Sequence, residues 1–551
     1  MKKIKLLCWL VVVVLFASAL AGCGTKQVQD DDDDVVTLRF LACWTSDSAI
    51  APENFLDNPV INKLKEETGV LLNLEFATTT NLEKLNTVFA SGDMPDIIST
   101  PYWGLTDSYT LLVKKAASQG LLLPIDDLVE KYGPNVKPAL TEGVTKDFVE
   151  FDLNPPEFEG KQYIIPAENP RSEADIINPG RTLYMRGDIY DALNVNPDDI
   201  NTSEDVYELL KKVKEGGFKD ITGKNVIPVS TFGGGYLAGL LCTSFDRQQM
   251  SFSGYTKVDG KIVDEQFNPL YTDRLLFLRK LISEGLFDVE AFSQNESRAQ
   301  EKMVRGSMAI IPGEYSIIQN QMESTLYVTN PEMRYVPLPF LEDADGERGR
   351  YLLDGNTGCP ILIIPSTCKN PEAAMKFINY LASDEGKLLI GYGLEGVHYD
   401  MVDDKPKFKD EWVEKYRQNP RLLYNEGIRG VYDRFSLFSD RYSRYGETDI
   451  GIGEITDPIF KQAQELSPFL GMKDGIRITC YEHSYPDIEK IRAVKNNTRN
   501  NEIFMGACFA ATPEEALKDL EDYRAEIRNA GIDDLFNYLE EQAQGRDDIL
   551  Y

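Results

Sequence analysis

Apolar and polar positions follow two periods along this chain, one typical of strands and one typical of helices. Short apolar runs predict strands at residues 35–41, 70–76 and from 96 onward. Apolar residues at helical spacing predict helices at residues 58–68 and 82–89. Gly69 directly follows the first helix, where a left-handed residue would end it. Strands and helices in strict alternation predict a parallel sheet covered by helices, and therefore an α/β fold.

The same alternation continues through the rest of the chain. Further strands are predicted at residues 161–166, 181–186, 227–230, 308–311 and 360–364. Further helices are predicted at residues 203–214, 272–285 and 371–383, and residues 512–544 are mostly helical. A chain of 551 residues is too long for one hydrophobic core, so we expect two or more domains. We find no internal repeat of fixed period in the sequence.

The N-terminus combines three basic residues, an apolar run at residues 6–21 and the sequence Leu-Ala-Gly-Cys at 20–23. An apolar run this short after basic residues is typical of a secretory signal and not of a membrane span. The Leu-Ala-Gly-Cys segment resembles the lipobox of bacterial lipoproteins, which implies that Cys23 carries lipid. The alternative is an ordinary signal peptide that contains a cysteine. Residues 24–34 are polar and end in five aspartates, which predicts a solvated tether.

The amino-acid composition and net charge limit the kinds of molecule that this protein is expected to bind. The formal net charge is −31, and removal of the signal lysines makes it more negative. This charge argues against nucleic acid, which needs a basic surface, and against polyanionic ligands as a default. The hydrophobic share of 42% and the charged share of 27% are those of a globular protein. No second apolar segment is long enough to span a bilayer, so we expect the body at the extracellular face of the cell membrane, held only by lipid.

Cysteine and histidine usage gives no support for a metal centre. Beyond Cys8 and Cys23, six cysteines remain, at positions 43, 242, 359, 368, 480 and 508, and none shows C-x-x-C spacing. An oxidising exterior permits disulfides, but no pairing follows from the sequence. The two histidines, His398 and His483, leave few donors for a metal site or a Ser-His triad. We therefore expect neither a metal nor a cofactor.

Seven segments carry a family resemblance. They are N-T-V-F-A-S-G-D-M-P-D-I-I at 86–98, G-K-Q-Y-I-I-P at 160–166, L-Y-M-R-G-D-I-Y-D-A-L at 183–193, L-I-S-E-G-L-F-D at 281–288, residues 303–315, residues 364–383 with K-N-P-E-A-A-M-K-F, and G-Y-G-L-E-G-V-H-Y at 391–399. In this order they resemble the extracellular solute-binding proteins of family 1, in the large lipoprotein subgroup of Gram-positive bacteria. The resemblance runs from about residue 35 to residue 530.

That resemblance implies a two-lobe, periplasmic-binding-protein-like fold of type II, with a cleft between the lobes and several hinge crossings. It implies a monomeric, non-enzymatic protein that delivers an oligosaccharide to the permease subunits of an ABC importer. The expected organisation is a signal peptide at 1–22, a lipidated cysteine and tether at 23–34, lobe 1 at 35–166 plus 311–355, lobe 2 at 167–310 plus 356–500, and a helical segment at 501–551.

A sugar ligand needs polar groups for its hydroxyls and aromatic rings for its apolar faces. In an α/β sheet these groups are expected on loops that follow the carboxyl ends of strands. The sequence offers the following candidates at such places: Trp44, Ser46 and Asp47; Trp103 and Asp107; Tyr236 in T-F-G-G-G-Y; Tyr315; and Asn356 in a glycine turn. In the family, positions matching Trp44, Asp47, Trp103, Tyr236 and Tyr315 often line the cleft, and Trp is common where this chain has Tyr315.

Several of these features have a structural alternative. Gly233 to Gly235 would suit a phosphate cradle or a flexible turn, and Arg186 a carboxylate clamp or a structural ion pair. We interpret His398 as a buried, hydrogen-bonded side chain, and we interpret Asp93 and Asp96 as structural residues. Three other functions remain open. They are a surface glycoside hydrolase, which needs two carboxylates about 5 to 9.5 Å apart, the same fold binding a peptide, and a sensor subunit.

Overall fold

The computed structural model describes residues 35–43, 55–77, 82–102, 108–142, 149–150, 153–155, 158–170, 178–235, 237–246, 254–323, 325–349, 360–418, 421–438, 457–468, 470–471, 476–495 and 505–551. The chain divides into two compact units. Unit 1 comprises Met1–Leu140, Lys161–Glu168 and Gly358–Phe438, and unit 2 comprises Thr141–Gly160, Asn169–Thr357 and Ser439–Tyr551. The prediction of more than one domain is therefore confirmed.

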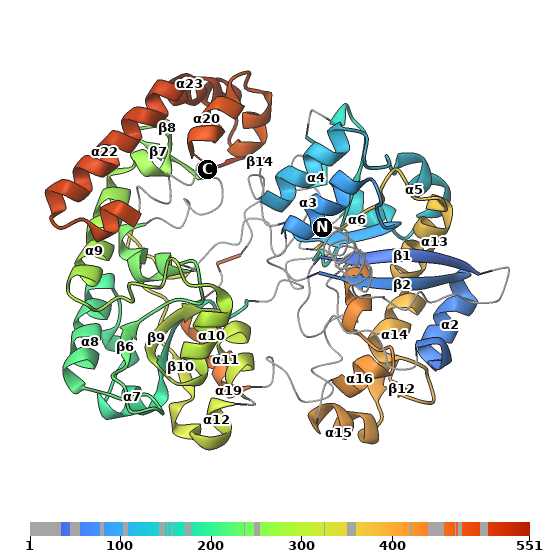
Figure 1. Cartoon of the computed structure of the whole chain (residues 1–551), viewed down its shortest axis with the longest axis horizontal. Coiled ribbons are helices and arrows are strands. Elements are labelled where there is room, and N and C mark those ends of the chain that lie inside the picture. The colour runs from blue at the N-terminus through green and yellow to red at the C-terminus, as the bar shows by residue number, and fades with distance from the viewer. Residues whose placement is uncertain are drawn as a thin grey trace, which may run out of the picture. The chain divides into compact units, whose positions relative to one another are not determined.

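Unit 1 is built on a mixed sheet with the strand order β2-β1-β3-β11-β4 (Figure 1). The strands are β1 (Val36–Ala42), β2 (Val70–Phe76), β3 (Ile97–Thr100), β4 (Ile164–Pro166) and β11 (Ile361–Ile363). β1 pairs in parallel with β2 and β3, as predicted, whereas β11 runs antiparallel to both β3 and β4. The sequence predicts this α/β class correctly and misses the reversed strand.

Helices cover both faces of this sheet, and Figure 1 shows α3 and α4 on one side of β1 and β2, with α2 and α14 on the other. The helices of unit 1 are α2 (Pro59–Thr68), α3 (Leu82–Ser91), α4 (Ser108–Ser118), α5 (Asp126–Tyr132), α6 (Lys137–Thr141), α13 (Pro371–Leu381), α14 (Asp384–Tyr392), α15 (Asp410–Gln418) and α16 (Arg421–Asn425). A hairpin of β12 (Tyr399–Val402) and β13 (Lys405–Phe408) follows α14. Local chemistry sets the ends of α2: Asn58 accepts from the amides of Val60 and Ile61, and Gly69 is left-handed with φ 66°.

Unit 2 has a second mixed sheet with the order β10-β5-β9-β6. Its strands are β5 (Thr182–Arg186), β6 (Ile227–Val229), β9 (Met308–Gly313) and β10 (Tyr335–Pro337). Its helices include α7 (Gly187–Ala192), α8 (Ser203–Gly216), α9 (Pro269–Ser283), α10 (Glu296–Val304), α11 (Tyr315–Glu323), α12 (Leu326–Thr329) and α19 (Pro458–Leu466). β5 and β9 are the two inner strands of this sheet, and both are buried along their whole length.

The C-terminal part of unit 2 packs around a separate hairpin of β7 (Tyr255–Val258) and β8 (Lys261–Asp264) (Figure 1). The elements around it are α20 (Ile488–Lys495), α22 (Pro513–Ala530), α23 (Ile532–Ala543), β14 (Ile476–Arg477) and β15 (Ile549–Leu550). Thr512 caps α22 by accepting from the amide of Glu515 at 3.2 Å. The predicted helical C-terminus is confirmed, split into two helices at Gly531.

The two units differ from the expected lobes in which unit contains residues 311–349 and which contains residues 360–438. Residues 311–349 belong to unit 2, because β9 pairs with β5 and β6. Residues 360–438 belong to unit 1, because β11 completes the first sheet. Both strands are short and wholly buried, and such a run does not reveal which sheet it will join. The expected lobes, with 311–355 in the first and 356–500 in the second, therefore differ from these units at residues 311–355 and 358–438, whereas 439–500 fall in unit 2 as expected.

Two further findings concern the described residues alone. None of their helices is long and apolar enough to cross a membrane. Among them, the cysteines at 43, 242, 368, 480 and 508 carry free thiols, and Cys359 lies outside the described ranges.

Candidate functional site

The strands β1 and β3, which precede two of the predicted ligand segments in the sequence, end at one edge of the unit 1 sheet. Ala42 pairs with Ser99 across parallel strands, Thr100 pairs with Ile361, and Ile361 pairs with Pro166. The carboxyl ends of β1, β3 and β4 and the amino end of β11 therefore meet at this edge, which we call the unit 1 edge. Six candidates lie outside the described residues, namely Trp44, Ser46, Asp47, Trp103, Asp107 and Asn356, so their contact with a ligand stays a prediction.

Buried polar groups lie at the unit 1 edge, at the end of β3. Ser99 and Thr100 are 0% exposed, and neither hydroxyl has a hydrogen-bond partner within the described part of the chain. Buried hydroxyls are normally paired, so these two atoms are available to a ligand, to water or to a neighbouring segment. Burial raises the pKa of the adjacent Cys43 thiol to about 12, so that thiol is neutral and unreactive.

Glu168, just after β4, is a residue that sequence reasoning missed. Its backbone is left-handed, with φ 57°, although it is not glycine. Its amide donates to the Ser436 carbonyl at 2.7 Å, and its carboxylate lies 3.9 Å from the buried guanidinium of Arg434. Non-glycine residues held in this conformation are strained and concentrate at functional sites. The sequence around Glu168 carries no signal of a positive φ.

Unit 2 presents a comparable edge, which we call the unit 2 edge. β6 and β9 are parallel, and β5 runs antiparallel to β9 with Thr182 opposite Gly313. The carboxyl ends of β6 and β9 and the amino end of β5 therefore meet there. Arg181, before β5, forms an ion pair with Glu314, after β9, with Nε–Oε1 at 3.0 Å.

Tyr315, a predicted ligand residue, begins α11 at the unit 2 edge. It is only 2% exposed, and its hydroxyl donates to Asp457 Oδ2 at 2.6 Å. Its ring lies edge-on to Phe460, with centroids 5.0 Å apart. The structure thus gives Tyr315 a packing role in the core of unit 2, and its contact with a ligand stays a prediction.

The glycine turn after β6, residues 231–235, precedes the predicted ligand residue Tyr236, which lies outside the described residues. Gly233, Gly234 and Gly235 all have positive φ, at 95°, 52° and 76°. The amide of Gly234 donates to the Gln294 carbonyl at 3.0 Å, and the amide of Gly235 to the Ala291 carbonyl at 2.9 Å. These two amides are used by the fold, which argues against a phosphate cradle and for a structured turn.

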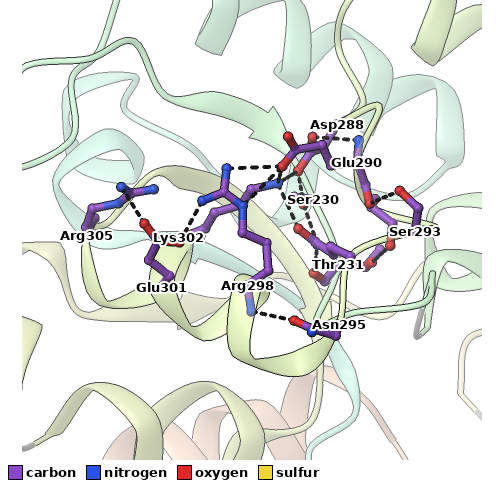
Figure 2. A network of polar contacts seen from close by, with 12 residues as sticks. Ser230, Thr231, Asp288, Glu290, Ser293, Asn295, Arg298, Glu301, Lys302 and Arg305 are labelled. Atoms are coloured by element: carbon purple, nitrogen blue, oxygen red, sulfur yellow. Dashed lines mark hydrogen bonds and ion pairs between the residues drawn. The ribbon is translucent and has the colours of Figure 1, made fainter. Parts of the chain in front are cut away.

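A buried polar network is connected to this turn (Figure 2). Lys302 on α10 is 3% exposed, and its ammonium donates to Asp288 at 2.6 Å, to Gln294 at 2.7 Å and pairs with Glu290 at 2.8 Å. Asp288 also accepts from the Ser230 hydroxyl at 2.6 Å. Hydrogen bonding from Lys302 lowers the pKa of the Glu290 carboxyl. The three protons of the ammonium are thus matched by three acceptors.

The other residues singled out in the sequence have structural roles. Arg186 is 1% exposed and pairs with Asp188 at 2.7 Å, so it is a structural ion pair and not a free clamp. His398 is buried, and its Nδ1 accepts from the amide of Leu394 at 2.9 Å. Burial lowers the pKa of His398 to about 4. Asp93 and Asp96 both bond Arg39, through its guanidinium at 2.7 Å and its amide at 2.8 Å.

No cluster of three or more His, Cys, Asp or Glu suited to a metal ion occurs in the described ranges. The chemistry that the two edges offer is hydrogen bonding and apolar contact.

Comparisons with known proteins place the chain in a family. The family model described as "Bacterial extracellular solute-binding protein" matches residues 49–388. The polygalacturonan/rhamnogalacturonan-binding protein YtcQ of Bacillus subtilis (strain 168) is 23% identical over 414 residues, 72% of this chain and 74% of that protein. The fructooligosaccharide ABC transporter substrate-binding protein FusA of Streptococcus pneumoniae serotype 4 is 26% identical over 300 residues, 51% of this chain and 53% of that protein.

The fold agrees with this placement. The crystal structure of the alginate-binding protein AlgQ2 without calcium ion has a TM-score of 0.62 and 18% identity, covering 93% of this chain and 98% of that one. The relatives are named for binding and transport, which supports a binding protein and not an enzyme. Because the family model spans more than half of its residues, the chain belongs to the bacterial extracellular solute-binding protein family.

Proposed function

We propose that this protein binds an oligosaccharide outside the cell and delivers it to the permease subunits of an ABC importer. The observation that carries the proposal is the parallel register of β1 and β3, the strands that precede Trp44 and Trp103 in the sequence, which end at the same edge of one sheet. Two aromatic rings and several acidic or hydroxyl side chains are the groups that a sugar needs. Relatives named for polygalacturonan and fructooligosaccharide binding support a carbohydrate ligand.

Within this proposal, Trp44 and Trp103 provide apolar faces, and Ser46, Asp47, Asp107 and Asn356 accept or donate hydrogen bonds. Tyr236 supplies a further aromatic contact from the unit 2 edge, and Tyr315 contributes there only if its bond to Asp457 is exchanged. The chain acts as a monomer, and no bond of the sugar is broken.

The second part of the proposal is a lipid anchor at Cys23. The basic start, the apolar run and Leu-Ala-Gly-Cys support it. A relative called Lipoprotein LipO, from Bacillus subtilis (strain 168), is 23% identical over 433 residues, 75% of this chain and 77% of that protein. Labelled palmitate should enter the wild-type protein in a bacterial host and should be absent from Cys23→Ser. Equal labelling of both proteins would disprove the anchor.

A melting-temperature screen tests the ligand class, since a ligand that binds only the folded protein raises its melting temperature. The panel contains kestose, trigalacturonate, an alginate trimer, a rhamnogalacturonan oligomer and a peptide mixture. We expect at least one saccharide to raise the melting temperature, with the interaction then measured by calorimetry. Stabilisation by the peptides alone would reassign the ligand class, and no shift with any saccharide would contradict the proposal.

A further inference from the structure

Phe232 is an aromatic residue at the unit 2 edge that the sequence did not single out. It is the second residue of the glycine turn after β6. Its side chain is partly exposed and packs against the buried cluster that contains Ile311 and Tyr315. An aromatic side chain with one part packed on a core and the rest accessible offers a rigid apolar surface at small entropic loss on binding.

The turn that carries Phe232 is bonded at four points to the segment 291–294. Besides the amides of Gly234 and Gly235, the side-chain amide of Gln294 donates to the Thr231 carbonyl at 2.7 Å, and the Thr231 hydroxyl donates to the Ala291 carbonyl at 3.3 Å. A Cβ on Gly235 would lie 2.7 Å from Phe292 Cδ1, so the turn also fits tightly against this segment. The position of Phe232 therefore follows that of residues 291–294.

The segment 288–294 is in turn fixed by Lys302. Its ammonium bonds side chains at both ends of the segment, that of Asp288 (Figure 2) and that of Gln294. Gln294 thus links Lys302 directly to the turn, through Oε1 on one side and Nε2 on the other.

A buried ammonium is a poor means of stabilising a core, because apolar residues of the same volume often serve as well or better. It is a good means of fixing geometry, since its three donors must meet three acceptors in defined directions. Lys302 is linked through Gln294 to a turn with an accessible aromatic ring, and this link favours the second role.

We propose that Phe232 contacts the carbohydrate and that Lys302 is a positioning residue for it, acting through Asp288, Gln294 and the glycine turn. The inference rests on the proposed carbohydrate binding and adds a contact and its supporting network.

The test measures sugar binding and amide hydrogen exchange on the full chain. Calorimetry with kestose and trigalacturonate compares wild type with Phe232→Ala, which should weaken binding of the recognised sugar about tenfold. Lys302→Met and Gln294→Met should each weaken it severalfold, and Phe232→Trp should retain it. Gln294→Met leaves the ion pairs of Lys302 in place, so it separates positioning from loss of folding. Lys211→Met removes an exposed pair with Glu208 on α8 and serves as the matched control, without effect.

Two results decide the positioning role. In the Phe232→Ala background, Lys302→Met and Gln294→Met should change affinity less than they do in wild type, because the Phe232 contact through which they act is gone. Hydrogen exchange at the amides of Gly234 and Gly235 should be faster in both variants than in Lys211→Met. Additive losses of affinity, or unchanged exchange, would overturn the positioning role.

Different binding results would refute the inference and the proposed function. If a saccharide binds wild type and Phe232→Ala equally well, the contact is refuted and carbohydrate binding stands. If none of the panel binds wild type, the proposed function fails and the contact fails with it, while the exchange rates still decide whether Lys302 orders the turn.

Discussion

Arg186 offers a sharp test of how unit 2 is held together. Its guanidinium is 1% exposed and donates to Asp188 at 2.7 and 2.9 Å, to the Lys219 carbonyl at 3.0 Å and to the Gly306 carbonyl. Arg186→Met keeps most of the side-chain volume and removes every one of these bonds. Breaking a buried ion pair costs about 3 to 5 kcal/mol. The Asp188 side chain is 26% exposed, so water replaces part of the loss and we expect about 3 kcal/mol.

The distribution of tryptophan makes this loss measurable within unit 2. Trp9 lies in the predicted signal peptide, Trp412 lies on α15 of unit 1, and Trp44 and Trp103 directly follow Cys43 and Tyr102 of unit 1 in the sequence, whereas helices and strands occur in both units. In a urea titration, fluorescence therefore reports unit 1 and circular dichroism reports both. Arg186→Met should lower the midpoint of the dichroism transition and leave the fluorescence transition in place.

The matched control is Arg298→Met, on α10 of the same unit. That guanidinium is 43% exposed and pairs with Glu290 and Glu301, so its removal should cost less than about 1 kcal/mol. If Arg186→Met destabilises unit 2 no more than Arg298→Met does, burial is not what makes the first pair important, and the reasoning is wrong.

Three further outcomes are expected. The pKa of His398 is lowered from 6.5 to about 4, so the unfolded chain binds a proton between these values that the folded chain does not. Unit 1 should then lose stability as pH falls through that window, on the order of 3 kcal/mol, and fluorescence-monitored melting of His398→Phe should show a shallower pH dependence. Gly235→Ala should lower the melting temperature more than Gly234→Ala, because only the first Cβ meets another atom within 4 Å. Trp103→Ala should weaken sugar binding by about 1 to 3 kcal/mol in calorimetry, and unchanged affinity would remove Trp103 from the site.

The sequence predicts elements well where the deciding contacts are local. The helix at Pro59–Thr68 has its cap in Asn58 and its stop in Gly69, each within a few positions of the residues that it serves. The strand β2 was predicted at its observed bounds for the same reason. Because β1 and β3 are separated by two helices and one strand, in alternation, their parallel pairing also follows from the order of elements.

Features that depend on distant residues escaped prediction. Nothing near β9 or β11 tells which sheet each joins, since that is decided by packing between segments far apart in the chain. The partners of Lys302 all lie between α9 and α10, but the network reaches the turn after β6 through Asp288 and Gln294, so no short motif reveals it. The left-handed Glu168 likewise bonds a residue far along the chain, Ser436.

The strand order of the first sheet has a consequence for biogenesis. β11 lies between β3 and β4, so an inner strand of that sheet is translated after most of unit 2. Until Ile361–Ile363 leaves the ribosome, β3 exposes an unpaired edge and β4 has no neighbour in the sheet. Pairing at such large sequence separation is slow. A nascent chain that stops short of this strand should therefore need a holding chaperone, and secretion should favour export before the amino-terminal half has folded.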